Sequence, residues 1–369
     1  MSTVSASTAQ QISSKLPLVQ IEKRERVQIE FDNRIFRHEA KAVLLRLLLY
    51  LRIIGKHLTA RKLLNFVSVE LDYFFTRPKC SGKPWSAKIE PTNICNLQCT
   101  YCPRDEAPYG LGSMSLENFQ RLIDEIKDHA FLIAIHLWGE PLLHKKLPAM
   151  IRYASENGIG TYVSSNFNIL TDQQARELIE SKLDLLTVCV DGADQETYEV
   201  FRKGGAVSKV LKNVERFIEI RREMRSSTPH VEMQFLITPR TEKEIPHVRE
   251  LARQIGVDSF KPKPVYPIMV ERNGKFFMPA GEQYHPQKRR GRPKACWWLW
   301  RTITIGWDGS VLPCCRVMFA SSIGNVFQKP LAELWNSGRY QELRGTFARG
   351  EKGASPCNVC HVPYGSMHG

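Results

Sequence analysis

Three cysteines stand close together in the segment Cys-Asn-Leu-Gln-Cys-Thr-Tyr-Cys, as Cys95, Cys99 and Cys102. Three closely spaced thiolates can hold three irons of a 4Fe–4S cube and leave the fourth iron without a protein ligand. An iron with that open position can chelate a small molecule, whereas a site closed by four cysteines cannot. The alternative is a zinc site that lacks one partner, although structural zinc normally has paired ligands and a closed shell of four.

The remaining cysteines indicate a second metal site. Eight of the ten cysteines fall in three groups, and two of these groups lie near the end of the chain. Clustered cysteines in a chain without a secretory signal bind metal more often than they form disulfides. Four of them, Cys296, Cys314, Cys357 and Cys360, are enough to close one further cluster, with Cys315 as the alternative to Cys314. A four-cysteine zinc ribbon is the competing interpretation. Two cysteines stand alone. Cys80 is predicted to have no role in metal binding, and Cys189 is predicted to be a buried strand residue, because a free cysteine packs as a small hydrophobic side chain.

The pattern of the central region predicts the scaffold that positions these residues. Short apolar segments alternate with amphipathic helices, and the candidate strands are 86–90, 132–138, 160–164, 184–190, 231–237 and 257–265. Helix starts are indicated at Ser115, at Thr171 and at a capping box formed by Thr241 and Glu244. Six β–α repeats predict an α/β fold with a parallel sheet, curved into a partial (β/α)6 barrel of the TIM type.

The domain plan follows from changes in composition along the chain. Residues 1–85 are predicted to be a polar lead and a basic amphipathic helical extension, and residues 86–266 the partial barrel. Residues 267–294 contain proline, glycine and a basic run, and they are predicted to be a linker. Residues 295–369 are rich in cysteine and tryptophan and are predicted to be a small iron–sulfur domain.

The extension has a strongly basic segment. Eight basic residues and one acid lie between Arg34 and Lys62, interleaved with leucines, and the whole chain has a formal net charge of +14. One interpretation is a helix packed on the catalytic domain with its basic face in water. The other is a helix that lies on an anionic membrane. No stretch of about 18 uncharged apolar residues predicts a membrane-spanning helix.

The cysteine spacing, with Tyr101 directly before the last cysteine, resembles the signature of the radical S-adenosylmethionine (SAM) superfamily. The resemblance implies that Cys95, Cys99 and Cys102 ligate a 4Fe–4S cluster whose open iron chelates the amino and carboxylate groups of SAM. Reduction then cleaves SAM to methionine and a 5′-deoxyadenosyl radical, which abstracts hydrogen from a substrate C–H bond. A reducing donor such as flavodoxin or ferredoxin is implied as a partner.

The end of the second strand matches a further motif of that superfamily. Gly139-Glu140-Pro141 stands where the family has a Gly-Gly-Glu-like motif, which accepts a hydrogen bond from the SAM ammonium. Trp138 replaces the first glycine of the usual form. Glu140 still supplies the required acceptor, so all three residues of the motif are candidate cofactor-binding residues.

The next two strand ends also carry family-like residues. Ser165 and Asn166 end the third strand, at the place of a motif near the ribose and carboxylate of SAM. Asp191 ends the fourth strand within an Asp-Gly pair, and Arg202 follows as a partner for an anionic group of SAM. Taken alone, Asn166 and Asp191 could be turn residues and Arg202 a surface charge.

The C-terminal cysteines resemble the auxiliary-cluster module of the SPASM and twitch subfamilies. Too few cysteines follow Cys360 for a full SPASM region, so the resemblance implies one auxiliary 4Fe–4S cluster, held by Cys296, Cys314, Cys357 and Cys360. The expected activity is that of a radical SAM oxidoreductase. It would oxidise a polar small molecule of the sugar or cyclitol type, with electron transfer to the auxiliary cluster.

Other substrates and partners stay open. The enzyme could modify a ribosomally made peptide, or a lipid or lipid-linked saccharide at a membrane. A non-enzymatic metal-binding protein is disfavoured because a structural site has no use for a missing ligand. The run Lys288–Lys294 contains an Arg-Gly-Arg-Pro sequence typical of minor-groove peptides, but one such copy recurs by chance and nucleic acid is not an expected partner. The polar N-terminus predicts a cytoplasmic protein, with peripheral membrane contact as a further possibility.

Overall fold

The computed structural model describes residues 33–100, 102, 104, 109–264, 271–272, 275–276, 296–315 and 322–349, and side chains from residue 44 onward except 45, 264 and 271–276. Residues 1–41 and 42–369 form two separate compact units. The fold below is that of the second unit.

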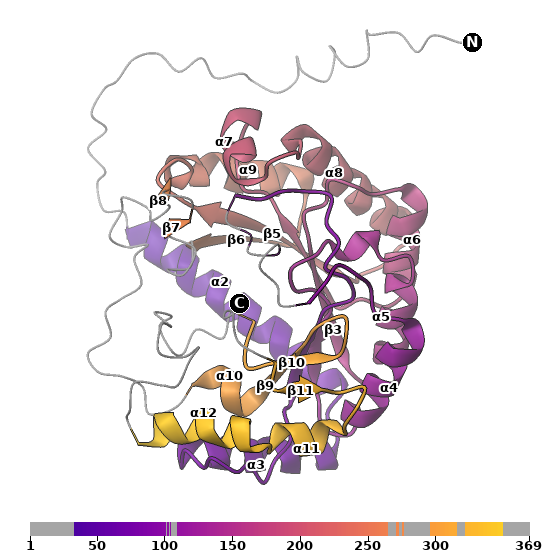
Figure 1. Cartoon of the computed structure of the whole chain (residues 1–369). Helices are drawn as coiled ribbons and strands as arrows, with labels where there is room; N and C mark the ends of the chain where they lie inside the picture. The colour runs from indigo at the N-terminus through magenta and orange to yellow at the C-terminus, as the bar shows by residue number, and fades with distance from the viewer. Residues whose placement is uncertain are drawn as a thin grey trace, which may run out of the picture. The chain divides into compact units, whose positions relative to one another are not determined.

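Six parallel strands form the centre of the sheet (Figure 1). They are β1 (Ser86–Ile89), β2 (Leu132–Ala134), β3 (Gly160–Ser165), β4 (Leu185–Cys189), β5 (His230–Ile237) and β6 (Ser259–Pro264), hydrogen-bonded in that order. The six predicted strands are therefore confirmed. Strand β2 is shorter than predicted because the chain leaves the sheet after Ala134 and turns into the functional site. The strands do not close on themselves in the part of the chain that is described, so the sheet is a partial barrel.

Helices connect the strands and cover the outer face of the sheet (Figure 1). They are α4 (Leu116–Ile126), α5 (Leu147–Glu156), α6 (Asp172–Glu180), α7 (Gln195–Phe201), α8 (Val207–Glu223) and α9 (Ile245–Ile255), with short 3-10 turns η2 (Pro141–Leu143) and η3 (Glu242–Glu244). Alternate strand residues such as Ile133, Val163 and Met233 are fully buried against this layer and form the core. Parallel sheets are buried in this way because each crossover places a helix on a face.

Two of the three predicted helix starts are confirmed. Ser115 Oγ accepts from Asn118 N–H, and Thr171 forms a reciprocal capping box with Gln174. The box predicted at Thr241 is wrong. The Thr241 hydroxyl donates to Leu236 O at 2.7 Å instead, which ties the loop back to the end of β5, and the chain forms η3 before α9 begins.

The C-terminal segment extends the same sheet. Strand β9 (Thr302–Ile305) pairs in parallel with β1, and β10 (Ser310–Leu312) and β11 (Gly324–Asn325) continue antiparallel beyond it. The turn between β9 and β10 holds Gly309 at a φ of +85°, where a Cβ would meet Phe327 and Asn325. Helices α10 (Trp297–Arg301), α11 (Leu331–Trp335) and α12 (Gly338–Ala348) accompany these strands, and β7 (Glu271–Arg272) pairs with β8 (Lys275–Phe276) as a separate hairpin.

Two helices precede the sheet, α2 (Asn33–Lys56) and α3 (Ala60–Phe74). From residue 42 onward, α2 packs on the face of the sheet opposite to α4, α5, α6 and α8 (Figure 1). Arg46 Nη1 lies 2.6 Å from Glu232 Oε2, and Lys56 Nζ lies 3.1 Å from Asp184 Oδ1. Arg52 and Lys56, the two residues of the predicted basic face whose side chains are described, are exposed, as expected for a helix packed with that face in water. Arg46 lies outside that face and turns inward, because the buried carboxylate of Glu232 pairs with it. Within the described residues, no helix is long and apolar enough to cross a membrane.

Candidate functional site

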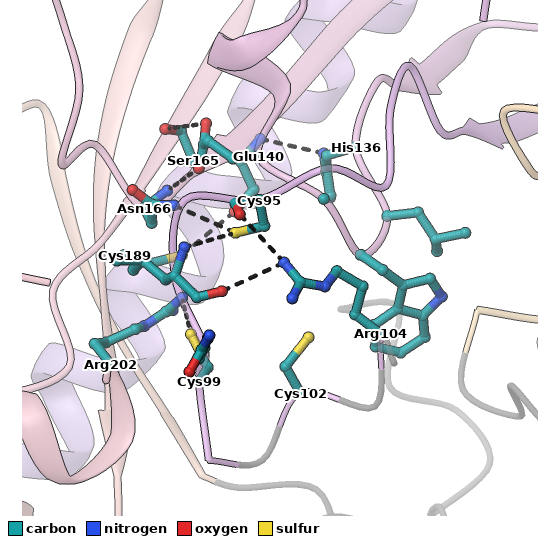
Figure 2. A pocket seen from close by; sticks show the side chains of 16 residues that line it. Cys95, Cys99, Cys102, Arg104, His136, Glu140, Ser165, Asn166, Cys189 and Arg202 are labelled. Atoms are coloured by element: carbon teal, nitrogen blue, oxygen red, sulfur yellow. Dashed lines mark hydrogen bonds between the residues drawn. The ribbon is translucent and has the colours of Figure 1, made fainter. Parts of the chain in front are cut away.

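A pocket of about 470 Å³ opens at the carboxyl ends of the central strands (Figure 2). This volume lies within the range of about 300–1,000 Å³ that is typical of small-molecule sites. The predicted site residues that line it are Cys95, Cys99, Cys102, Gly139, Glu140, Ser165, Asn166 and Arg202. The tertiary structure thus brings together residues that lie up to about a hundred positions apart in the chain.

The loop that carries the cysteine triad is held by backbone contacts to the end of α7. Gln98 N–H donates to Lys203 O at 3.0 Å, and Thr100 N–H donates to Phe201 O at 3.0 Å. Arg104 Nη1 donates to Cys95 O at 3.3 Å and closes the loop from its other side. The thiols are therefore positioned by the strand before them and by the helix that follows β4.

The three thiols are suited to binding iron. None of them forms a disulfide, and burial raises the pKa of Cys95 and raises the pKa of Cys102 to about 11. Half-buried thiols of this kind become thiolates when a metal cation binds, because the ligand is the deprotonated form. Among the described residues, no three His, Cys, Asp or Glu side chains converge on one metal ion. The separation of the three cysteine thiols is compatible with a 4Fe–4S cube, in which each thiolate binds a different iron.

A buried indole group adds to this fit. Trp138 Nε1 is buried in the pocket wall and has no hydrogen-bond partner within the described structure. A buried donor without a partner costs about 1–3 kcal/mol, so an acceptor on a bound group would compensate it. Trp138 stands where the family motif has its first glycine, and its departure from that motif supplies a donor that glycine lacks.

Gly139 and Glu140 dock directly against the segment that leads into the triad. A Cβ on Gly139 would lie 2.1 Å from Thr92 O, so only glycine allows this approach. Glu140 N–H donates to Ile94 O at 2.9 Å. Pro141 follows as the first residue of η2; it is buried and lies outside the pocket lining.

The Glu140 carboxylate is almost fully engaged by the protein. It accepts from Leu142 N–H at 3.0 Å, from Ser165 Oγ–H at 2.8 Å and from Asn166 N–H at 2.8 Å. Burial raises its pKa, and these hydrogen bonds oppose that shift. Since a carboxylate has about four acceptor positions, about one remains for a ligand. Binding of the SAM ammonium stays a prediction, and the observed role is to tie the end of β2 to the end of β3.

Asn166 and Arg202 direct nitrogen atoms towards the sulfurs (Figure 2). Asn166 Nδ2 lies 3.9 Å from Cys95 Sγ and 3.0 Å from Asn96 Oδ1. Arg202 Nη1 lies 3.7 Å from Cys99 Sγ. Hydrogen bonds and charge near cluster sulfurs adjust reduction potentials, so these groups can act on the cluster as well as on SAM.

Asp191 lies outside the pocket lining and pairs with Arg202. The guanidinium places two nitrogens 2.5 Å from Asp191 Oδ2, and Leu236 N–H donates to Asp191 Oδ1. Asp191 is buried, so the pair is shielded from solvent. The geometry favours Asp191 as the residue that orients Arg202, whereas direct cofactor binding by Asp191 stays a prediction.

Sequence reasoning missed a row of polar side chains across the floor of the pocket. Ser164 N–H donates to His136 Nδ1 at 3.1 Å, and Cys189 Sγ lies 3.4 Å from Ser164 Oγ and 3.6 Å from Gln234 Nε2. Burial lowers the pKa of His136 well below its usual value, and nearby Lys88 and Lys263 add to the shift. Cys189 is a buried strand residue, as expected, but it also lines the pocket. The available signal was spacing: Ser164 and Cys189 each stand two residues before a predicted site residue, Asn166 and Asp191, near the end of a strand.

Glu90 was also missed. It ends β1 fully buried, where it accepts from Trp138 N–H at 3.2 Å and from Trp307 N–H at 3.4 Å. Burial raises its pKa to about 7. Glu90 therefore joins the wall of the pocket to the turn between β9 and β10.

The C-terminal cysteines are described in part. Cys296 precedes α10, and Cys314 and Cys315 follow β10, with Cys315 buried and Cys314 half-exposed. Cys357, Cys360 and Tyr101 lie outside the described residues, as does the basic run 288–294. The four-cysteine ligand set therefore stays a prediction.

Comparison with known proteins agrees with this arrangement. The family model of the radical SAM superfamily matches residues 89–252, and the SPASM model, described as an iron–sulfur cluster-binding domain, matches residues 296–361. The two matched ranges together cover more than half of the chain. Such domains imply a 4Fe–4S cluster, SAM and an auxiliary cluster.

Two curated relatives cover most of the chain. The tungsten-containing aldehyde ferredoxin oxidoreductase cofactor-modifying protein of Pyrococcus furiosus is 23% identical over 291 residues, which are 69% of this chain and 82% of that protein. The PqqA peptide cyclase of Granulibacter bethesdensis is 24% identical over 311 residues, which are 75% of this chain and 79% of that protein.

The fold is also similar to that of SuiB from Streptococcus suis, solved with bound S-adenosylmethionine. The TM-score is 0.58 at 16% identity, over 75% of this chain and 71% of that chain. A second SuiB structure, bound to the precursor peptide SuiA, has a TM-score of 0.57 at 14% identity, over 91% of this chain and 76% of that chain. With both domain models matched in sequence order, this chain belongs to the radical SAM superfamily and carries a C-terminal SPASM domain.

Proposed function

We propose that this protein cleaves SAM reductively in the pocket at the carboxyl edge of the sheet and abstracts hydrogen from a substrate C–H bond. The observation that carries the proposal is the convergence of three unpaired cysteine thiols with Glu140 and Arg202 in one cavity. When bound, the first cluster and SAM supply the 5′-deoxyadenosyl radical, and an auxiliary cluster closed by cysteines supplies an electron acceptor.

The protein's own residues have three tasks in this proposal. Cys95, Cys99 and Cys102 hold the cluster, and Glu140 accepts from the SAM ammonium. Arg202, oriented by Asp191, places a cation beside Cys99, where it would pair with the carboxylate of bound SAM. A charge-assisted contact of this kind contributes about 1.5–3 kcal/mol when it is buried.

We propose a net two-electron oxidation of a polar small molecule of the sugar or cyclitol type. The polar lining of the pocket supports a polar substrate, because His136 and Ser164 lie in it beside the cofactor residues.

A second candidate function is modification of a peptide. It is favoured by the PqqA peptide cyclase, whose match covers 75% of this chain. SuiB, which shares the fold, has been solved bound to a precursor peptide. The two candidates share the radical chemistry and differ in the size of the substrate.

Metal content tests the cofactor assignment. Anaerobically reconstituted protein should contain about eight irons, and the Cys95→Ala/Cys99→Ala/Cys102→Ala variant about four, for two 4Fe–4S clusters. Zinc in place of the second set of irons would remove the electron-acceptor role and leave the SAM chemistry intact. An unchanged iron content in the triple variant would refute the assignment of the triad.

The substrate class is tested by isotope transfer. The reconstituted enzyme is incubated with SAM, a reductant and either deuterated aminocyclitols and sugars or deuterated peptides, and deuterium is measured in 5′-deoxyadenosine by mass spectrometry. Transfer from the small molecules with formation of an oxidised product supports the first candidate. Transfer from peptides alone refutes it and favours the second.

A further inference from the structure

The two N-terminal helices expose an apolar surface that the rest of the described chain does not share. Fourteen large hydrophobic residues are exposed among the described residues, and eleven of them lie between residues 44 and 75. This apolar face consists of Leu44, Leu47, Leu48, Leu51, Leu58, Leu63, Leu64, Val67, Leu71, Phe74 and Phe75. Scattered exposed leucines need no explanation. The exposed residues here recur at helical spacing, at 44, 47, 48 and 51 on α2 and at 64, 67, 71 and 74 on α3, so each helix carries an apolar stripe of the kind that marks a contact surface.

The face is built into the way the helices pack. Helix α3 begins at the N-cap Thr59 and turns Val69 and Asp72 into the protein, where Asp72 accepts from the backbone of Ser81 and Gly82. The opposite side of the helix carries Leu64, 70% exposed, and Phe74, 77% exposed. The inner side of α3 is thus held by Asp72 and by ring contacts of Phe66 and Tyr73, while the apolar side chains of its outer side stay exposed.

Helix α2 shows the same inversion. Arg46 points inward to Glu232, whereas four leucines between residues 44 and 51 are exposed. A helix that only docked on its own core would bury these leucines and leave Arg46 in water.

The charges around the face have one sign. Between residues 44 and 83 the exposed charged residues are all basic: Arg52, Lys56, Arg61, Arg77, Lys79 and Lys83. The two acids of this segment are turned inward, Glu70 towards Arg301 and Asp72 towards Ser81. Among the basic residues, Arg52, Lys79 and Lys83 have no ion-pair partner within the described structure. An apolar face bordered by unpaired cations is complementary to an anionic lipid surface.

We propose that the apolar face of α2 and α3 docks this enzyme on the surface of an anionic lipid bilayer. A protein partner or a second copy of this chain is less well matched, because lysine is depleted in protein interfaces and here it borders the face. The helices lie on the surface in this proposal, with Leu and Phe side chains among the lipid chains. The proposal is independent of the substrate.

The test is co-sedimentation of the full chain with vesicles. Phosphatidylcholine vesicles containing phosphatidylglycerol should bind the protein, pure phosphatidylcholine should bind it less, and salt should weaken binding as it screens the basic residues. The variant Leu64→Gln/Val67→Gln/Leu71→Gln/Phe74→Gln should bind the vesicles at least about tenfold more weakly than the wild type, because it loses the apolar surface that would enter the lipid. Glutamine is a good helix former, so α3 is retained.

The matched control is Leu111→Gln, compared with the single change Leu64→Gln. Leu111 is 68% exposed and lies outside the apolar face. Leu111→Gln should bind vesicles as the wild type does, whereas Leu64→Gln should bind more weakly, and circular dichroism of every variant verifies the fold. Failure of the wild type to sediment with anionic vesicles overturns the proposal. The proposal is also overturned if the fourfold variant sediments with the vesicles as the wild type does. It is likewise overturned if the wild type does not bind vesicles but forms a dimer that the fourfold substitution dissociates.

Discussion

Replacing Gly139 by alanine tests the contact on which the pocket is built. The added Cβ would lie 2.1 Å from Thr92 O, 2.7 Å from Asn93 Cα and 2.8 Å from Ile94 O. All three atoms belong to the backbone that leads into Cys95, so no flexible side chain can move aside. The segment around Gly139 must separate from that backbone, and the hydrogen bond from Glu140 N–H to Ile94 O is then lost.

The size of the effect follows from these two losses. Overpacking costs about 1–3 kcal/mol, and a backbone hydrogen bond contributes about 0.5–1.5 kcal/mol. Gly139→Ala should therefore destabilise the protein by about 2–4 kcal/mol. With an unfolding entropy of about 2.1 cal/mol/K per residue over the 369 residues of the chain, the thermal midpoint should fall by about 3–5 °C. Since a displacement near 1 Å can cost about 100-fold in rate, SAM cleavage should fall by a similar factor.

The assays are anaerobic thermal unfolding and the rate at which 5′-deoxyadenosine forms. Gly338→Ala is the matched control, because it makes the same chemical change at the start of α12, where a Cβ would meet nothing within 4 Å. Gly338→Ala should leave both readouts at the wild-type level or raise the midpoint slightly. A Gly139→Ala protein with the wild-type midpoint and cleavage rate would show that the close approach is not required.

Three further substitutions test the electrostatics of the site. Glu140→Gln should weaken SAM binding by about 10- to 100-fold in an equilibrium binding assay. It should also lower the thermal midpoint, because the NH2 group of the glutamine must face a donor such as Asn166 N–H. Unchanged SAM affinity would refute the role of Glu140. Arg202→Ala should lower the free energy of unfolding, measured with a chemical denaturant, by about 3–5 kcal/mol, because Asp191 then stays buried without its cation. The double variant Arg202→Ala/Asp191→Asn should recover part of that loss. If it recovers none, the two residues are not energetically coupled. The raised pKa of Glu90, about 7 against an ordinary 4.5, means that the folded state binds the extra proton, so the native protein loses stability as pH rises from about 4.5 to 7. Glu90→Gln should therefore gain about 2–3 kcal/mol relative to the wild type between pH 5 and pH 8, and a pH-independent difference would refute the shift.

Local features of the fold could be predicted because they depend on neighbours in the chain. The six strands follow from runs of apolar residues, and the caps at Ser115 and Thr171 form within four residues. The cap predicted at Thr241 failed because its hydroxyl found a tertiary partner at the end of β5. A local rule cannot anticipate such a competitor.

Features that depend on distant contacts could not be predicted. One of the two neighbours of β1 is β9, more than two hundred residues later in the chain, and only strand pairing in space decides that order. The inward position of Arg46 on α2 follows from Glu232, which needs a cation because the folded sheet buries it. Hydrophobic periodicity identifies the apolar side of a helix but not which side the rest of the protein will accept.

The sequence by itself determined the family of this protein and the cofactors that the family implies, because the cysteine spacing that identifies them lies in short segments. The tertiary structure decided how those residues are used. It directs three donors to the Glu140 carboxylate, pairs Asp191 with Arg202, and places His136 and Cys189 in the floor of the pocket. The physical reason is that burial and hydrogen-bond partners, which set the charge and orientation of each group, come from strands that are adjacent only in the folded sheet.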